Sequence, residues 1–113
     1  MATNKFGVKL DSNGYAPSLM QSEEEQAYCY RCGRSCEKLD RHEPLGGANR
    51  EKSKELGLWV VLCHFSCHQE APHSVHKDAS EANRLRVKAQ RVAMKHYGWS
   101  TADFIREFGR SYI

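Results

Sequence analysis

The chain has 113 residues, a formal net charge of +3 and five cysteines. A chain this short forms one domain and buries only a modest fraction of its surface, so a metal staple would contribute much to its stability. The odd cysteine count and the lack of a signal-peptide pattern argue against a secreted disulfide framework and favour a reducing cytoplasm. No apolar run reaches the roughly 20 residues that cross a bilayer, so we expect no membrane partner. The mild positive charge permits a nucleic-acid partner without requiring one.

Residues 1–27 are polar, with a turn signal at Asn13-Gly14 and an acidic run at positions 23–25. We expect an N-terminal arm here that is ordered only where it docks. The side chains available to pack onto the domain of residues 28–113 are those of Tyr15, Leu19 and Met20.

Cys29 and Cys32 are separated by two residues and followed by Gly33, which is typical of a zinc knuckle around a tight turn. Cys36 is a spare thiol; we expect it to be half-buried or at the surface, and its alternative role is to replace Cys32 as a ligand. Residues 37–45 are expected to be extended, with Gly46-Gly47 reversing the chain.

Residues 49–56 predict a short helix with Asn49 as its N-cap, Glu51 and Lys54 as an ion pair, and Gly57 as its stop. The run 58–62 is apolar throughout and β-branched at its centre. This pattern predicts a buried strand of a small sheet that ends where Cys63 meets the metal.

Residues 61–76 place two cysteines and four histidines within sixteen positions. Cys63 and Cys67 form a second thiol pair, although three residues separate them where two are usual. Two such pairs, at positions 29/32 and 63/67, indicate a structural zinc site, and four thiolates leave no open coordination position for catalysis. The alternative is that these cysteines are redox-active or disulfide-bonded. The order of knuckle, hairpin, strand and helix predicts a treble clef.

Residues 78–97 have a helical pattern, with apolar residues recurring every three or four positions and Gly98 as the stop. A neighbouring side of this helix carries a basic stripe, which is either a solvated face or a phosphate-binding one: Arg84, Lys88, Arg91 and Lys95.

Ser100 and Asp103 form a variant capping box that opens a last helix, and Gly109 ends it. We expect Phe104, Ile105 and Phe108 to point inward from this helix. The predicted fold class is therefore α+β: a small zinc-stapled treble clef with a helical C-terminal extension that begins at about residue 78.

Residues 28–76 resemble the HNH endonucleases, the ββα-metal nucleases that carry a structural zinc, and in particular their small phage- or prophage-encoded members. The motifs behind the resemblance are the two cysteine pairs, residues 39–43 leading into Gly46-Gly47, His68 directly after Cys67, and His76. The resemblance implies an enzyme that hydrolyses DNA, with RNA as a further substrate, in the cytoplasm of an infected or lysogenic bacterium. It also implies one catalytic divalent ion, which is Mg²⁺, Mn²⁺, Ni²⁺ or Zn²⁺ in that family.

Carried across residue by residue, the resemblance matches His42 to the first-strand histidine, and His68 and His76 to histidines of the helix region. Asn49 is matched to the asparagine that orients the base. The family usually has Asp-His or His-His adjacent, whereas this chain reads Asp40-Arg41-His42-Glu43.

Because of this departure, two assignments of the general base and the metal ligands remain open. In the first, His42 is the general base, because an imidazole titrates near neutral pH, and Asp40 binds the metal with His68 and His76. In the second, His42 is a metal ligand and Glu43 takes the position of the base, which requires burial to raise its pKa.

A non-catalytic binding module is the rival function. It would keep the zinc fold with a broken active site and use the basic stripe to hold nucleic acid or an acidic protein, as a phage-encoded inhibitor of a host protein would. The enzyme needs a second ion near His42 and His68, whereas the module needs only one zinc.

Overall fold

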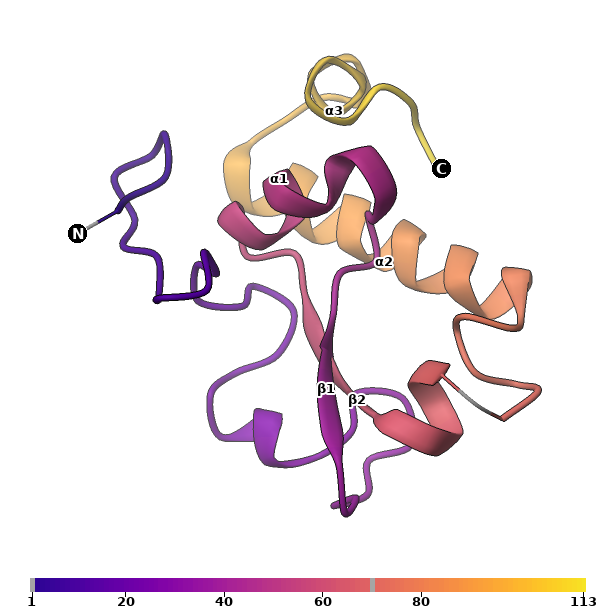
Figure 1. The fold of residues 1–113 in the computed structure, drawn as a ribbon. Coiled ribbons are helices and arrows are strands. Elements are labelled where there is room, and N and C mark those ends of the chain that lie inside the picture. Colours follow the sequence, from indigo (N-terminus) through magenta and orange to yellow (C-terminus); the bar gives the residue numbers. More distant parts are fainter. Residues whose placement is uncertain (1, 70) are drawn as a thin grey trace.

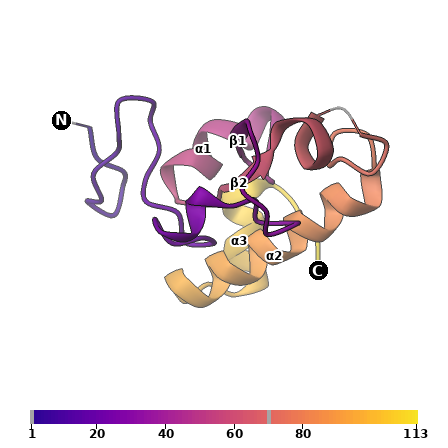
Figure 2. The same cartoon turned by 90° about the horizontal axis from the view of Figure 1, so that it is seen from below.

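A two-stranded antiparallel sheet stands at the centre of the molecule (Figure 1). The computed structural model describes residues 2–69 and 71–113. Its elements are η1 (Glu25–Ala27), β1 (Leu39–His42), η2 (Gly47–Asn49), α1 (Arg50–Glu55), β2 (Val60–Cys63), η3 (His64–Gln69), α2 (Ala79–Tyr97) and α3 (Thr101–Phe108). The predicted α+β class is confirmed in this form. Figures 1 and 2 show α2 crossing one face of the sheet, while α1 and α3 lie at one end of it.

The register of the sheet decides which way the candidate site residues point. Asp40 pairs with Leu62 and His42 with Val60, so these side chains share one face of the sheet. Val60 and Leu62 are fully buried on that face, in a cluster that includes Leu85 of α2. Because side chains alternate along a strand, residues 41 and 43 belong to the opposite face.

The second part of the core joins α2 and α3 to the segment that precedes β2. Phe104 and Phe108 stack on each other and pack with Leu58, Ala89 and Ala93. Both helices end as predicted, at Gly98 and Gly109, where the backbone takes the left-handed conformation. The capping box at Ser100 and Asp103 is also confirmed, since each residue bonds the backbone N–H of the other.

Two local predictions are wrong. Ile105 is 41% exposed. Residues three positions apart share one face of a helix, and Ala102 is also exposed, so Ile105 lies on the outer face of α3, away from Phe104 and Phe108. Helix α1 begins as expected after Asn49, but the Asn49 side chain does not cap it. Its amide instead donates a hydrogen bond to the carbonyl of Phe108, so it ties α1 to α3.

The N-terminal arm docks along the free edge of β2. Tyr15 is buried with Trp59 and Val61 on the face opposite His42. The Trp59 indole donates to the carbonyl of Ala16, and the backbone N–H of Val61 donates to Gln21 Oε1. Polar groups of the arm thus satisfy an edge that would otherwise be buried without partners. This explains why a segment of polar composition is ordered here.

A substitution at Gly57 would measure how much the contact with the N-terminal arm contributes to stability. Its φ is +77°, and a Cβ there would overlap the carbonyl oxygen of Pro17 and lie 3.1 Å from Leu19 Cγ. Gly57→Ala should therefore lower the free energy of unfolding by about 2–4 kcal/mol, from left-handed strain plus overpacking. Chemical denaturation measures this loss.

Gly98→Ala is the matched control, because Gly98 has a φ of +68° and a Cβ there would meet no other atom within 4 Å. It should cost only about 1–2 kcal/mol, from the left-handed conformation alone. Equal losses in the two variants would show that the contact with the arm does not contribute.

Candidate metal centres and the adjoining cleft

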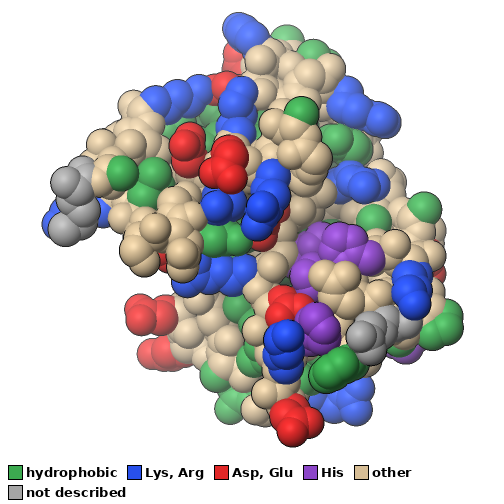
Figure 3. Space-filling model, viewed as in Figure 1, with side chains coloured by type: hydrophobic (Ala, Val, Ile, Leu, Met, Phe, Trp, Pro, Cys, Tyr) green, Lys and Arg blue, Asp and Glu red, His purple; other side chains and the backbone are tan. Residues whose placement is uncertain are grey.

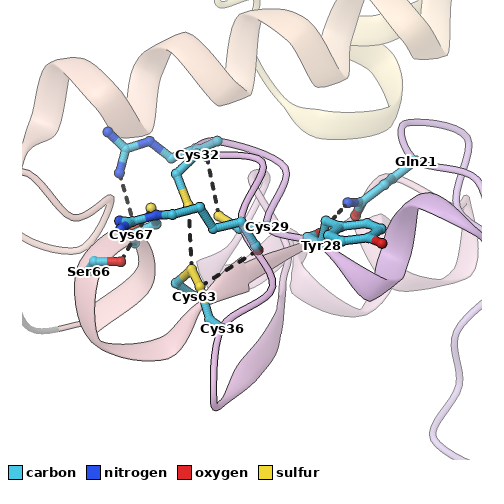
Figure 4. Close-up of a disulfide and its surroundings, with 10 residues drawn as sticks. Gln21, Tyr28, Cys29, Cys32, Cys36, Cys63, Ser66 and Cys67 are labelled. Atoms are coloured by element: carbon cyan, nitrogen blue, oxygen red, sulfur yellow. Dashed lines mark hydrogen bonds between the residues drawn. A yellow bond between two sulfur atoms is a disulfide. The ribbon is translucent and has the colours of Figure 1, made fainter.

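Four cysteine sulfurs converge at the end of β2 (Figure 4). The Sγ atoms of this sulfur cluster all lie within 4.8 Å of one another, and they belong to Cys29, Cys32, Cys63 and Cys67. A tetrahedral ion with metal–sulfur bonds of about 2.3 Å places its sulfurs about 3.8 Å apart. The Cys32 and Cys63 sulfurs are 3.5 Å apart, which fits that spacing. The four cysteines could thus hold a structural metal ion.

The thiols of the sulfur cluster differ in acidity. At Cys32, burial opposes ionisation, but hydrogen bonds to Arg34 outweigh it and lower the pKa to about 7. Burial is the largest cause that raises the pKa of Cys67 to about 11, and the neighbouring thiols Cys29 and Cys32 add to it. A divalent cation would reverse this preference, because coordination deprotonates a thiol outright.

Cys36 is not the spare thiol that the sequence predicted. In the structure its sulfur is bonded to that of Cys63, with the two Cα atoms 5.6 Å apart (Figure 4). Cys63 cannot be a thiolate ligand while this disulfide exists, so metal binding through all four sulfurs requires the reduced chain.

The wide turn η3 carries residues of two clusters on successive positions. Cys67 points into the sulfur cluster, whereas the buried side chain of His68 points toward β1. A π-helical turn holds one more residue than an α-helical turn, and such turns occur often at functional sites. The spacing of three residues between Cys63 and Cys67 is accommodated in this turn.

Three histidine rings meet beside β1, and we call them the histidine trio: His42, His68 and His76. One ring nitrogen of each lies within 4.8 Å of the others. The Nε2 atoms of His68 and His76 are 3.0 Å apart, a spacing that two ligands of one ion with bonds of about 2.1 Å can adopt. His68 is buried and His76 exposed, so the trio is open on one side. Figure 3 shows histidine side chains at the surface of this face, with basic side chains nearby.

Asp40 lies behind the trio rather than within it. Its Oδ2 is 2.8 Å from His68 Nδ1 and also contacts His64 Nδ1. A carboxylate on the rear nitrogen of a histidine fixes the ring and leaves Nε2 free to bind a metal. Burial opposes the ionisation of Asp40, but its hydrogen bonds to His68 and His64 outweigh it and hold its pKa below the usual value. His64 is thus part of the same network as His68.

The environment of His42 keeps its ring neutral. Burial is the main cause that lowers the pKa of His42 to about 3, and the charges of His68, His76 and Arg86 add to it. At neutral pH the ring therefore offers a lone pair, as a metal ligand does. Such a low pKa is unfavourable for a general base, which works best with a pKa near the operating pH.

Glu43 points to the face opposite His42, as the alternation along β1 requires. It is buried, with Oε1 2.6 Å from Arg50 Nε and Oε2 accepting a hydrogen bond from Tyr15 at 3.0 Å. Burial and the carboxylate of Glu43 together raise the pKa of Tyr15 to about 12, so the phenol remains a donor. Each carboxylate oxygen has two acceptor positions, so Glu43 can still accept a further proton donor.

The basic stripe occupies the outer surface of α2. All four of its residues are exposed: Arg84, Lys88, Arg91 and Lys95. Arg84 pairs with Glu81, and the Lys88 ammonium lies 5.3 Å from the centroid of the Tyr30 ring. The Asn49 amide is engaged by the carbonyl of Phe108, and the family role matched to it stays a prediction.

A cleft of ≈ 490 Å³ adjoins the trio, and sequence reasoning missed its far wall. His42 and His76 line one side, while Arg86, Arg110 and Tyr112 line the other. A second cavity of ≈ 280 Å³ shares His42 and His76 and adds His68 and Arg50. The only sequence signal for this wall was the basic and aromatic composition of residues 110–112.

No protein-family model, curated protein or solved structure matches the chain. Among the described residues, no helix is long and apolar enough to cross a membrane. Inferences about function therefore rest on the sulfur cluster, the histidine trio and the cleft between them and α2.

Proposed function

We propose that the chain is a metal-dependent endonuclease of the HNH type, which hydrolyses phosphodiester bonds of DNA at the histidine trio. The observation that carries this proposal is the convergence of three imidazoles, from β1, η3 and the loop before α2, at the edge of an open cleft. Three protein ligands with an open side are typical of catalytic metal sites, whereas four closed ligands are typical of structural ones.

The donor set indicates the kind of ion. Imidazole nitrogens suit zinc, nickel and other transition ions, whereas Mg²⁺ prefers oxygen ligands. A bound ion would supply Lewis-acid stabilisation of the charge that develops on the phosphate. Asp40 would hold the His68 ring in position, and the cleft would admit the strand.

The geometry favours the second of the two assignments made from the sequence. His42 is neutral and faces His68 and His76, so it serves as a ligand. Glu43 borders the same cleft and keeps free acceptor positions, so its carboxylate takes the proton of the attacking water after turning from Arg50 toward the trio. In the structure Arg50 and Tyr15 hold the carboxylate on the face opposite His42. Asp40 then orients His68 instead of binding the metal.

We further propose that the reduced sulfur cluster holds Zn²⁺ through four thiolates and that residues 28–76 form a treble clef around it. Residues 29–32 supply one pair of ligands, and the end of β2 with η3 supplies the other. Such an ion would link the two segments in a chain with little apolar core.

The binding module remains the second candidate because of one observation. The Asn49 amide is engaged by Phe108, so it is not free for the orienting role that the resemblance assigns to it. A protein that binds DNA but cleaves neither DNA nor RNA with any divalent ion would have this second function.

Plasmid cleavage tests the nuclease proposal directly. Ni²⁺ or Zn²⁺ should support cleavage better than Mg²⁺, because the ligands are nitrogens. His76→Ala should weaken binding of the catalytic ion, so its activity should partly return at high metal concentration. His73→Ala is the matched control, since His73 is an exposed histidine three residues earlier in the same loop. Equal activity of the two variants would exclude His76 as a ligand.

Glu43→Gln separates the base from the ligands. Because it removes a proton acceptor and keeps the shape, cleavage should fall by roughly 10²–10⁴-fold, the usual contribution of general-base catalysis. Metal affinity, measured by titration calorimetry, should be unchanged, whereas His42→Ala should weaken it. If His42→Ala left metal affinity intact and abolished cleavage, the first assignment would be right.

Metal analysis of the reduced protein tests the zinc proposal. We expect one tightly bound zinc per chain at the sulfur cluster, and Cys63→Ser should lose both this zinc and cooperative melting, because structural zinc contributes on the order of 10 kcal/mol of apparent binding free energy. Cys36→Ser should keep both. Loss of zinc in Cys36→Ser but not in Cys67→Ser would show that Cys36 replaces Cys67 as the ligand.

A further inference from the structure

The far wall of the large cleft is built from α2 and the last residues of the chain. Arg86 lies on α2, and Arg110 and Tyr112 follow α3, yet all three line the same cavity as His42 and His76. In Figure 1 the C-terminal segment turns back toward the first half of α2. Residues distant in the sequence thus meet directly opposite the trio.

A buried glutamine holds this wall in place. Gln90 of α2 is 0% exposed, and its Nε2 donates to Ser111 Oγ at 2.9 Å. Its Oε1 accepts the backbone N–H of Tyr112 at 2.6 Å. Because both polar ends of a buried amide are used, the chain after α3 is fixed to α2 rather than left free.

Tyr112 contacts both guanidinium groups of this wall. Arg110 Cζ lies 4.7 Å from the centroid of the Tyr112 ring, and Arg86 Cζ lies 5.9 Å from it. Arginine stacks on aromatic rings while its N–H groups stay free at the edge of the plane. Both side chains are therefore positioned with donors available to the cleft.

Neither guanidinium has a carboxylate partner among the described residues. Other arginines of the chain do form ion pairs: Arg31, Arg41, Arg50, Arg84 and Arg106. The carboxylate that borders the cleft belongs to Glu43, and it is already paired with Arg50. Two positive charges that line one cleft without a carboxylate partner favour an anion in that cleft, and planar guanidinium groups fit phosphate oxygens well.

We infer that Arg86 and Arg110 bind a backbone phosphate of the DNA strand whose neighbouring phosphodiester lies at the histidine trio. The choice of DNA rests on the proposed function. These two arginines are positioning residues: they hold the strand across the cleft so that the ester bond reaches the trio. The smaller cavity beyond the trio, bordered by Arg50, gives the strand an exit.

This assignment differs from the one expected for the basic stripe. At 3.6 residues per turn, Arg86 lies roughly 200° around α2 from Arg84, so the stripe and the cleft occupy different sides of the helix. The basic stripe and the two cleft arginines therefore cannot contact the same DNA strand as it enters the cleft. The salt dependence of binding distinguishes them.

The test measures anisotropy of a short fluorescein-labelled DNA duplex with no divalent ion added, over a range of salt concentrations. Arg86→Gln and Arg110→Gln should each weaken binding roughly 10- to 100-fold, as the loss of a hydrogen bond to a charged group does. Each should also reduce the slope of log affinity against log salt by about 0.9. Arg106→Gln removes an equal charge from the exposed face of α3 and should change neither quantity.

Thermal melting verifies that each variant is folded, and Arg110→Lys should keep the slope while binding more weakly, because a lysine keeps the charge but not the planar fork. If the Arg84, Lys88 and Arg91 triple variant flattened the slope and the cleft variants did not, the inference would be overturned. Arginine-dependent binding without cleavage by any ion would refute the proposed nuclease but leave the phosphate site standing. Cleavage of DNA by the wild-type protein, together with unchanged DNA affinity in both cleft variants, would refute the phosphate site and leave the proposed nuclease standing.

Discussion

The attachment of η3 to the sulfur cluster is the constraint on which the rest of the site depends. Cys67 faces the other sulfurs, so the next side chain, His68, has to leave the turn in a different direction. That direction leads to Asp40 on β1, which holds the rear nitrogen of His68. A shift of η3 would therefore move the central ring of the histidine trio and at the same time break its hydrogen bond to Asp40. A structural ion at the sulfur cluster would therefore act on the histidine trio through this geometry.

The alternation of side chains along β1 distributes the remaining roles. His42 and Asp40 share the face that packs against α2 and η3, whereas Glu43 reaches the other face, where the N-terminal arm supplies Tyr15. Two adjacent residues thus lie in environments of different chemistry. One is a neutral imidazole held by burial, and the other is a carboxylate held by a cation and a phenol.

Features that local sequence determines could be predicted. The limits of α2 follow from Asp78 and Gly98, and the capping box of α3 from Ser100 and Asp103. The closeness of His42, His68 and His76 followed from motif spacing in the resemblance. Features that depend on contacts between distant segments could not be predicted. The docking of the arm depends on Gln21 and Trp59, and the pairing of Cys36 depends on where β2 ends.

The same limit explains why the basic residues were placed on one side of α2 only. Helical spacing identifies a stripe from Arg84 to Lys95, because its members are neighbours on the helix surface. It does not single out Arg86, which lies on another side of the helix and meets Tyr112 only because the C-terminal segment folds back onto α2.

That return depends on Gln90, a polar residue whose burial no periodicity would predict. Gln90 holds the cleft wall in place, yet the helical pattern of apolar residues would assign this polar side chain to the boundary of the core or to solvent. Charge that is concentrated by tertiary contacts next to reactive groups is better placed to hold a substrate than charge spread along a solvated face, where water and salt screen it.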